Sequence, residues 1–187
     1  HKFQKLEIRK RFSIESDTFI TGFVFRNQLR KEVRPLLEGF NAFKRNNPGI
    51  KAKLLLLTNY SESGGWNIPK MIKDLNIDNN DILTVYICKN CKKYQEKSFN
   101  GQDLDCPHCK AQKQQSTCSV EFGIKENELN EIYNLMDCSC HSITNGGMEL
   151  PIIEHLFTEG ISATVNYSCG TTYCSQSIFN IIDNAWT

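Results

Sequence analysis

Hydrophobic positions along the chain follow two alternating periodicities. Residues 18–25 (TFITGFVF) are rich in β-branched and aromatic side chains and predict a strand, whereas the near-continuous apolar runs 52–58 and 81–87 predict strands buried on both faces. Between these strands, apolar residues at helical spacing predict helices over 29–45 and 68–75. The predicted order in the first half is therefore β-α-β-α-β.

The same alternation returns in the second half. Segments 125–136 and 150–157 predict helices, and segments 136–142 and 161–166 predict strands. Strands that alternate with helices over short loops favour a parallel sheet covered by helices on both faces. We expect an α/β, Rossmann-like domain formed by residues 12–87 and 119–187, interrupted by an insertion at 88–118.

The balanced charge of the chain argues against a protein that attracts nucleic acid through its overall charge. The chain has 187 residues, with 22 Lys plus Arg against 21 Asp plus Glu, so its net charge of +1 provides no global field for nucleic acid. A basic cluster at the start contains Lys2, Lys5, Arg9, Lys10 and Arg11. We interpret that cluster as solvated surface.

The sequence contains no stretch of the roughly 18 to 20 apolar residues that a membrane-spanning helix needs. Its first twelve residues lack the apolar segment of a signal peptide. We expect a cytoplasmic protein without a transmembrane segment. In such a protein, clustered cysteines favour metal ligation over disulfides.

Four of the nine cysteines form two CxxC pairs, Cys88 with Cys91 and Cys106 with Cys109. Each pair supplies two sulfurs from one turn, and four thiolates leave no open position on the metal, so the pattern predicts a structural zinc ribbon over 88–118. His108 is an alternative ligand that the regular spacing disfavours. Contact of the ribbon with nucleic acid finds no support in the sequence, and we interpret the other five cysteines as buried, inert thiols.

Two loops are candidates for ligand binding, because ligands of such sheets lie beyond the carboxyl ends of the strands. The first, RNQLRK, places Arg26 at a strand end and Lys31 in the first turns of the next helix, where both cations can converge on a phosphate pair. A solvated basic helix start explains this loop alone equally well.

The second loop is NGGMELPIIE, residues 145–154. Gly146 and Gly147 permit close approach of the backbone, and Pro151 suits the first turn of a helix whose free amides form an anion site. Glu154 falls inside an apolar helix, where a carboxylate needs hydroxyls or cations as partners. An exposed helical glutamate is the alternative interpretation.

Residues 12–87 and 119–175 resemble the C-terminal, nucleotide-sugar-binding domain of GT-B fold retaining glycosyltransferases (glycosyltransferase family 4-like, group 1). The matching stretches are FRNQLRKEVRPLLEGF and ELNEIYNLMDCSCHSITNGGMELPIIEHLFTEGISATVNYSCG. The resemblance implies that Arg26 and Lys31 bind the diphosphate and that Glu154 binds the ribose hydroxyls. It also implies that the amides around Met148, Glu149 and Leu150 face the diphosphate and the sugar.

The chain departs from the family pattern at one position of the site. The family commonly has a glutamate eight residues before the position of Glu154, and this chain has Gly146 there. Glu149 or backbone amides are the alternatives for contacting the sugar hydroxyls. The zinc ribbon is a second departure, and the N-terminal acceptor domain of the family has no counterpart in the sequence.

These patterns lead to one expected function and one rival. We expect the donor-binding half of a retaining glycosyltransferase, with Arg26, Lys31 and Glu154 as catalytic residues and a donor-binding loop at Gly146, Gly147, Met148, Glu149 and Leu150. Its ligands are a nucleotide-diphosphate sugar and an unknown acceptor, and it needs no divalent ion for the transfer. The rival is a non-catalytic binding module whose zinc ribbon contacts protein or nucleic acid.

Overall fold

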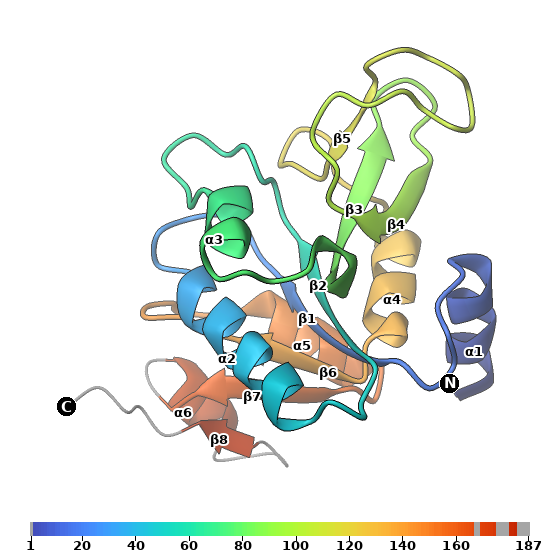
Figure 1. Cartoon of the computed structure of the whole chain (residues 1–187). Helices are drawn as coiled ribbons and strands as arrows, with labels where there is room; N and C mark the ends of the chain where they lie inside the picture. Colours follow the sequence, from blue (N-terminus) through green and yellow to red (C-terminus); the bar gives the residue numbers. More distant parts are fainter. Residues whose placement is uncertain (1, 167–168, 175–179, 183–187) are drawn as a thin grey trace.

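The fold is built on one twisted sheet, shown in Figure 1. The computed structural model describes residues 2–166, 169–174 and 180–182. The strand order is β4-β3-β2-β1-β6-β7-β8, and β5 pairs with β3 off this path. Six of these strands are parallel to their neighbours in the order β3-β2-β1-β6-β7-β8, which is the doubly wound Rossmann arrangement. The predicted α/β class is confirmed.

The parallel strands are β1 (Phe19–Val24), β2 (Ala52–Leu57), β3 (Ile82–Cys88), β6 (Cys138–His141), β7 (Ile161–Val165) and β8 (Asn180–Ile182). The helices are α1 (Lys2–Arg11), α2 (Val33–Asn46), α3 (Ile68–Asp74), α4 (Glu126–Leu135), α5 (Leu150–Phe157) and α6 (Cys169–Cys174), and a short 3-10 helix spans Asn79–Asp81. No helix in the described part of the chain has the length and apolar character to cross a membrane.

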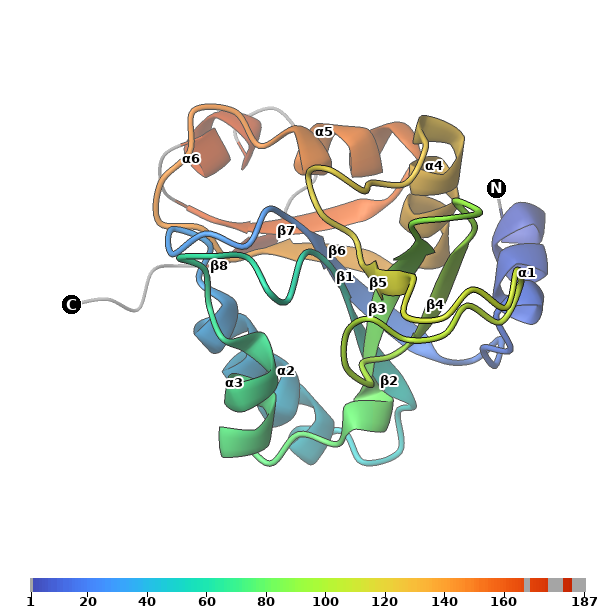
Figure 2. The ribbon, with the colours of Figure 1, turned by 90° about the horizontal axis from the view of Figure 1, so that it is seen from above.

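Helices cover both faces of the sheet, as Figure 2 shows from above. The apolar side chains of α2 and α3 pack on one face together with Leu54 and Leu56 of β2, and those of α1 and α4 pack on the other face with Leu55. Because successive residues of β2 enter different cores, this strand is buried on both faces as its sequence predicts.

The start of the chain differs from the prediction. Lys2–Arg11 forms helix α1, and three residues of the basic cluster are ion-paired: Arg11 with Glu131 at an exposed position, and Lys5 and Arg9 with Asp137. Both Lys5 and Arg9 contact Asp137, each at 2.6 Å, and the Arg9 side chain is only 5% exposed. The expectation of a solvated cluster is wrong for these two residues, because a distant carboxylate gives them a partner.

Helix α2 begins four residues later than its apolar spacing predicts. Lys31 forms a backbone bridge with Ile143, and the N–H of Glu32 donates to the Ser142 carbonyl at 2.8 Å. These contacts hold 31–32 outside the helix, so Lys31 precedes α2 instead of lying in its first turns.

The insertion joins the sheet directly. Its strands β4 (Tyr94–Ser98) and β5 (Gln115–Thr117) both pair antiparallel with β3, and the first predicted metal ligand, Cys88, is the last residue of β3. The ribbon therefore extends one edge of the sheet rather than forming a separate hairpin.

Candidate functional site

The crevice of the sheet lies where the strand order reverses, between β1 and its neighbour β6. In doubly wound sheets, ligands bind beyond the carboxyl ends of the strands at such a switch point. The segments that follow these two strands are 25–32 and 142–149. Both loops identified from the sequence therefore lie at the switch point.

Backbone hydrogen bonds join the two loops. The bridge between Lys31 and Ile143 is flanked by a bond from the Thr144 N–H to the Arg30 carbonyl at 3.1 Å. On the other side, the indole N–H of Trp66 donates to the Lys31 carbonyl at 2.7 Å. These bonds fix the backbone of Lys31 beside the loop after β6.

Lys31 forms a buried ion pair at this point. Its Nζ lies 2.5 Å from Oε1 of Glu149, and the two side chains are 4% and 7% exposed. Burial lowers the pKa of Lys31, although its hydrogen bond to Glu149 and the charge of that carboxylate act in the opposite direction. The guanidinium of Arg30 contacts the same carboxylate oxygen at 3.2 Å and donates to the Asn145 carbonyl at 2.9 Å.

Arg26 lies outside this cluster. Its exposed side chain pairs with Glu62 at 2.8 Å. Next to it, the buried amide of Asn27 donates to the carbonyls of Asn59 and Trp66 at 3.1 and 3.0 Å, so it ties the loop after β1 to the loop after β2. Sequence reasoning missed Arg30 and Asn27, because only their contacts with distant loops distinguish them from ordinary polar residues.

Glu154 is directed to a neighbouring helix. The hydroxyl of Tyr133 on α4 donates to its Oε2 at 2.6 Å. The need for a hydroxyl partner, anticipated from the apolar sequence around Glu154, is thus met within the protein. Among the described residues, no hydrogen bond or ion pair joins Glu154 to Arg26 or Lys31.

The glycine loop has one crowded position and one open position. A Cβ added at Gly146 would lie 2.5 Å from Oε1 of Glu149, whereas one added at Gly147 would have no neighbour within 4 Å. Met148 and Leu150 are 63% and 55% exposed. Of the five predicted donor-loop residues, the structure therefore places only Gly146 and Glu149 beside the charged side chains of Arg30 and Lys31.

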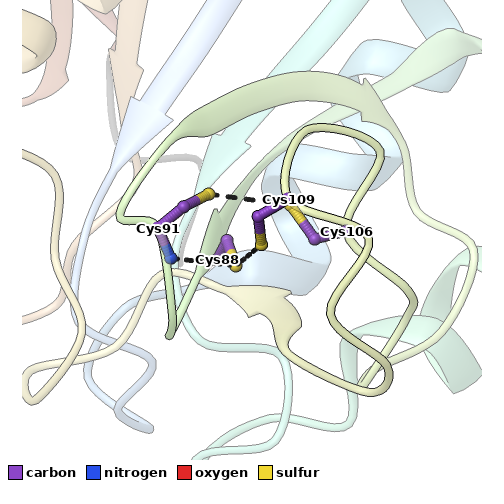
Figure 3. Close-up of side chains that lie close together, drawn as sticks. All are labelled: Cys88, Cys91, Cys106 and Cys109. Carbon is purple, nitrogen blue, oxygen red and sulfur yellow. Dashed lines mark hydrogen bonds between the residues drawn. The ribbon is translucent and has the colours of Figure 1, made fainter.

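The four cysteines of the ribbon form a second candidate site, drawn in Figure 3. Their sulfurs all lie within 4.8 Å of one another, with Cys88 to Cys109 and Cys91 to Cys106 both at 3.7 Å. A tetrahedral zinc with bonds of about 2.3 Å separates its sulfurs by about 3.8 Å. The cluster therefore has the donors and the spacing to hold a metal ion, with Cys109 rather than His108 as the fourth residue.

The other thiols are less uniformly buried than expected. Cys118 and Cys169 are buried, but Cys138 and Cys140 on β6 are half-buried. Cys140 also accepts a hydrogen bond from the Thr21 hydroxyl at 3.3 Å. The Cys174 side chain lies outside the described part of the structure.

No family model matches the sequence, and no curated protein is significantly similar to it. Solved structures nevertheless share its fold. A sucrose-phosphate synthase from Thermosynechococcus elongatus matches with a TM-score of 0.64 at 12% identity, over 96% of this chain and 36% of that chain. The C-terminal domain of a glycosyl transferase group 1 family protein from Francisella tularensis matches with a TM-score of 0.59 at 11% identity, over 97% and 75%.

A UDP-forming trehalose-phosphate synthase from Burkholderia xenovorans matches with a TM-score of 0.56 at 11% identity, over 97% of this chain and 38% of that chain. The fold is that of a Rossmann-like domain of GT-B glycosyltransferases. At these identities the likeness establishes the fold alone. The chain spans 36% of the sucrose-phosphate synthase chain and 38% of the trehalose-phosphate synthase chain.

Proposed function

We propose that this chain is the donor-binding half of a retaining glycosyltransferase and binds a nucleotide-diphosphate sugar at the switch point of the sheet. The observation that carries the proposal is a buried lysine, Lys31, held at the carboxyl end of β1 opposite the loop that follows β6. An ammonium group in this position attracts an anion, and the solved structures with this fold include a UDP-forming trehalose-phosphate synthase.

The chemistry we propose is electrostatic. As the bond between sugar and diphosphate breaks, negative charge builds on the departing phosphates, and pre-placed cations stabilise it without a metal ion. Lys31 and Arg30 both contact Glu149 in the loop after β6, whereas Arg26 pairs with Glu62 and would have to leave it to bind the phosphates. Glu154 binds the ribose by exchanging the Tyr133 hydroxyl for a ligand hydroxyl. The acceptor and the N-terminal domain that binds it belong to a further part of the enzyme.

We also propose that the four thiols bind a structural Zn²⁺. Soft sulfur ligands at these separations favour zinc, and four protein ligands leave no position for substrate. The ion would fix the ribbon at the end of β3 and take no part in sugar transfer.

Calorimetry with UDP, GDP and ADP and their sugars tests the proposal. We expect saturable binding of one base series, lost on Lys31→Met. Arg34→Ala is the matched control, because Arg34 is an exposed cation on α2 that pairs only with Glu38 among the described residues. The absence of saturable binding to every nucleotide and nucleotide sugar would reject the proposal.

A second candidate function is a non-catalytic binding module. The favouring observation is the ribbon surface, where Lys92, Lys93, Lys110 and Lys113 are all exposed. Titration with a single-stranded oligonucleotide distinguishes the two: binding there, without nucleotide-sugar binding, would favour the module.

A further inference from the structure

The cation site at the switch point already contains an anion. Oε1 of Glu149 lies 2.5 Å from Nζ of Lys31 and 3.2 Å from Nη1 of Arg30. Counted over the whole residue, Glu149 and Lys31 are only 5% and 3% exposed. One internal carboxylate therefore occupies the position between the cations that an external phosphate would need.

Glu149 does not hold this position for the sake of its helix. It is the N-cap residue of α5, yet its side chain makes no capping hydrogen bond. Instead the carboxylate folds back over Gly146, where an added Cβ would lie 2.5 Å from its Oε1. Since real contacts of this kind exceed 3.0 Å, a side chain at 146 and the observed position of Glu149 exclude each other.

Electrostatics make Glu149 a competitor for the ligand. A diphosphate that entered beside this carboxylate would face a like charge in a buried site, where such repulsion is poorly screened. A buried lysine that loses its carboxylate needs another anion, which the diphosphate supplies. Binding and departure of Glu149 are therefore coupled.

We propose that Glu149 is an internal competitor in the donor site: an anion that a nucleoside diphosphate must displace from Lys31 and Arg30. This inference rests on the proposed function. The neighbours of Glu149 in the chain, Met148 and Leu150, are largely exposed, so the segment that carries Glu149 borders solvent. Glu149 thereby sets how strongly a ligand must bind before the site accepts it.

The test compares binding of inorganic pyrophosphate and UDP to the wild-type chain and to two variants. Glu149→Gln keeps the shape and removes the charge, and Gly146→Ala displaces the carboxylate by steric contact while the net charge stays the same. Each is expected to bind pyrophosphate at least about tenfold more tightly than the wild type, because removing one competing charge is worth about one decade in affinity. Glu38→Gln, which removes an exposed carboxylate from α2, is the matched control and should leave affinity unchanged.

The outcomes separate this inference from the proposed function. If wild type, E149Q and G146A bind pyrophosphate equally and K31M abolishes binding, the cation site stands and the role of Glu149 is rejected. If no protein binds pyrophosphate or UDP, both are rejected. If the gain in E149Q disappears in the E149Q/K31M double variant, Glu149 acts through Lys31 as proposed. Far-UV circular dichroism verifies that each variant is folded.

Discussion

Asp137 is the residue that attaches helix α1 to the sheet. It accepts hydrogen bonds from Lys5 and Arg9, both at 2.6 Å, and from the N–H of Ile20 at 2.8 Å. Burial alone would raise the pKa of Asp137, but these hydrogen bonds and the two positive charges outweigh it and hold the pKa below the ordinary value of 3.8. A single carboxylate thus stabilises contacts across more than a hundred residues of sequence.

Replacing Asp137 by Asn should destabilise the protein by about 3 kcal/mol, because Arg9 would keep its buried charge without an ionic partner. Urea unfolding at pH 7 measures this change. The control is Asp74→Asn, which breaks an exposed pair with Lys70 and should cost less than about 0.5 kcal/mol. Equal effects of the two substitutions would contradict the assigned role of Asp137.

The ion pairs of Asp137 with Lys5 and Arg9 also predict that the stability of the protein depends on pH. The pKa of Asp137 is lower in the folded than in the unfolded chain, so the ionised group stabilises the fold above the unfolded value, and this stability is lost as the pH falls through the lowered pKa. The difference in unfolding free energy between wild type and D137N should shrink below about pH 4. A difference that persists undiminished at pH 2 would count against this linkage.

Two buried histidines also make the folded protein less stable in acid, at a milder pH than Asp137 does. Burial lowers the pKa of His141 to about 3 and that of His155 to about 4. Both rings contact the Ser139 hydroxyl, at 3.0 and 2.9 Å. In the unfolded chain they take up protons near pH 6.5, so acid favours unfolding.

Stability should therefore decrease by up to about 2 kcal/mol per histidine between pH 6.5 and pH 5. Urea titrations across this range measure the slope. His155→Gln, which removes one of the two groups, should reduce the slope by about half. An unchanged slope in this variant would show that other groups cause the acid sensitivity.

At the scale of elements, the side chain of Met136 can pack directly over strand β1 because that strand has glycine at position 22. A Cβ on Gly22 would lie 1.8 Å from Sδ of the buried Met136, which precedes β6. Gly39, in the interior of α2, has nothing within 4 Å of an added Cβ. The two glycines have the same chemistry but opposite surroundings.

Gly22→Ala should destabilise the protein by about 1 to 3 kcal/mol through overpacking, since Met136 must move. Gly39→Ala should stabilise it by about 0.5 to 1 kcal/mol, because alanine favours a helix interior. Thermal unfolding of both variants gives the two signs. Stabilisation by G22A would mean that Met136 repacks without cost.

If the four thiols bind zinc as proposed, the fold of the ribbon depends on that ion. Both of its strands pair with β3, and Cys88 ends that strand, so loss of the ion should release 89–118 and fray the β3 edge. Hydrogen exchange after chelation should show loss of protection there while β1 and β6 stay protected. Cys106→Ser should give the same pattern without chelator, and unchanged exchange in either experiment would refute a metal-dependent ribbon.

At the scale of the whole molecule, the α/β fold follows from local patterns. Alternation of buried apolar runs with helical spacing predicts the order of β1, α2, β2, α3 and β3, because burial on two faces requires that pattern. Helix α1 is not predicted, since its sequence is basic and its anchor, Asp137, lies 128 residues from Arg9. Contacts over such separations cannot be deduced from a single sequence.

The candidate site shows the same limit. The two loops were predicted, because parallel strands direct ligands to their carboxyl ends and glycines mark the turns. The pairing of Lys31 with Glu149, 118 residues apart, depends on which strands become neighbours, and this topology decides which charges meet. The sequence therefore suggests Glu149 as a contact for the sugar hydroxyls but does not reveal it as the partner of Lys31.

The backbone bridge between Lys31 and Ile143 joins the two loops that flank the proposed site. If these loops must part before a nucleotide is captured, association becomes a two-step process. The observed rate should then rise with nucleotide concentration and level off at the rate of opening. Stopped-flow mixing would reveal this plateau, and the turnover of a complete enzyme could never exceed it.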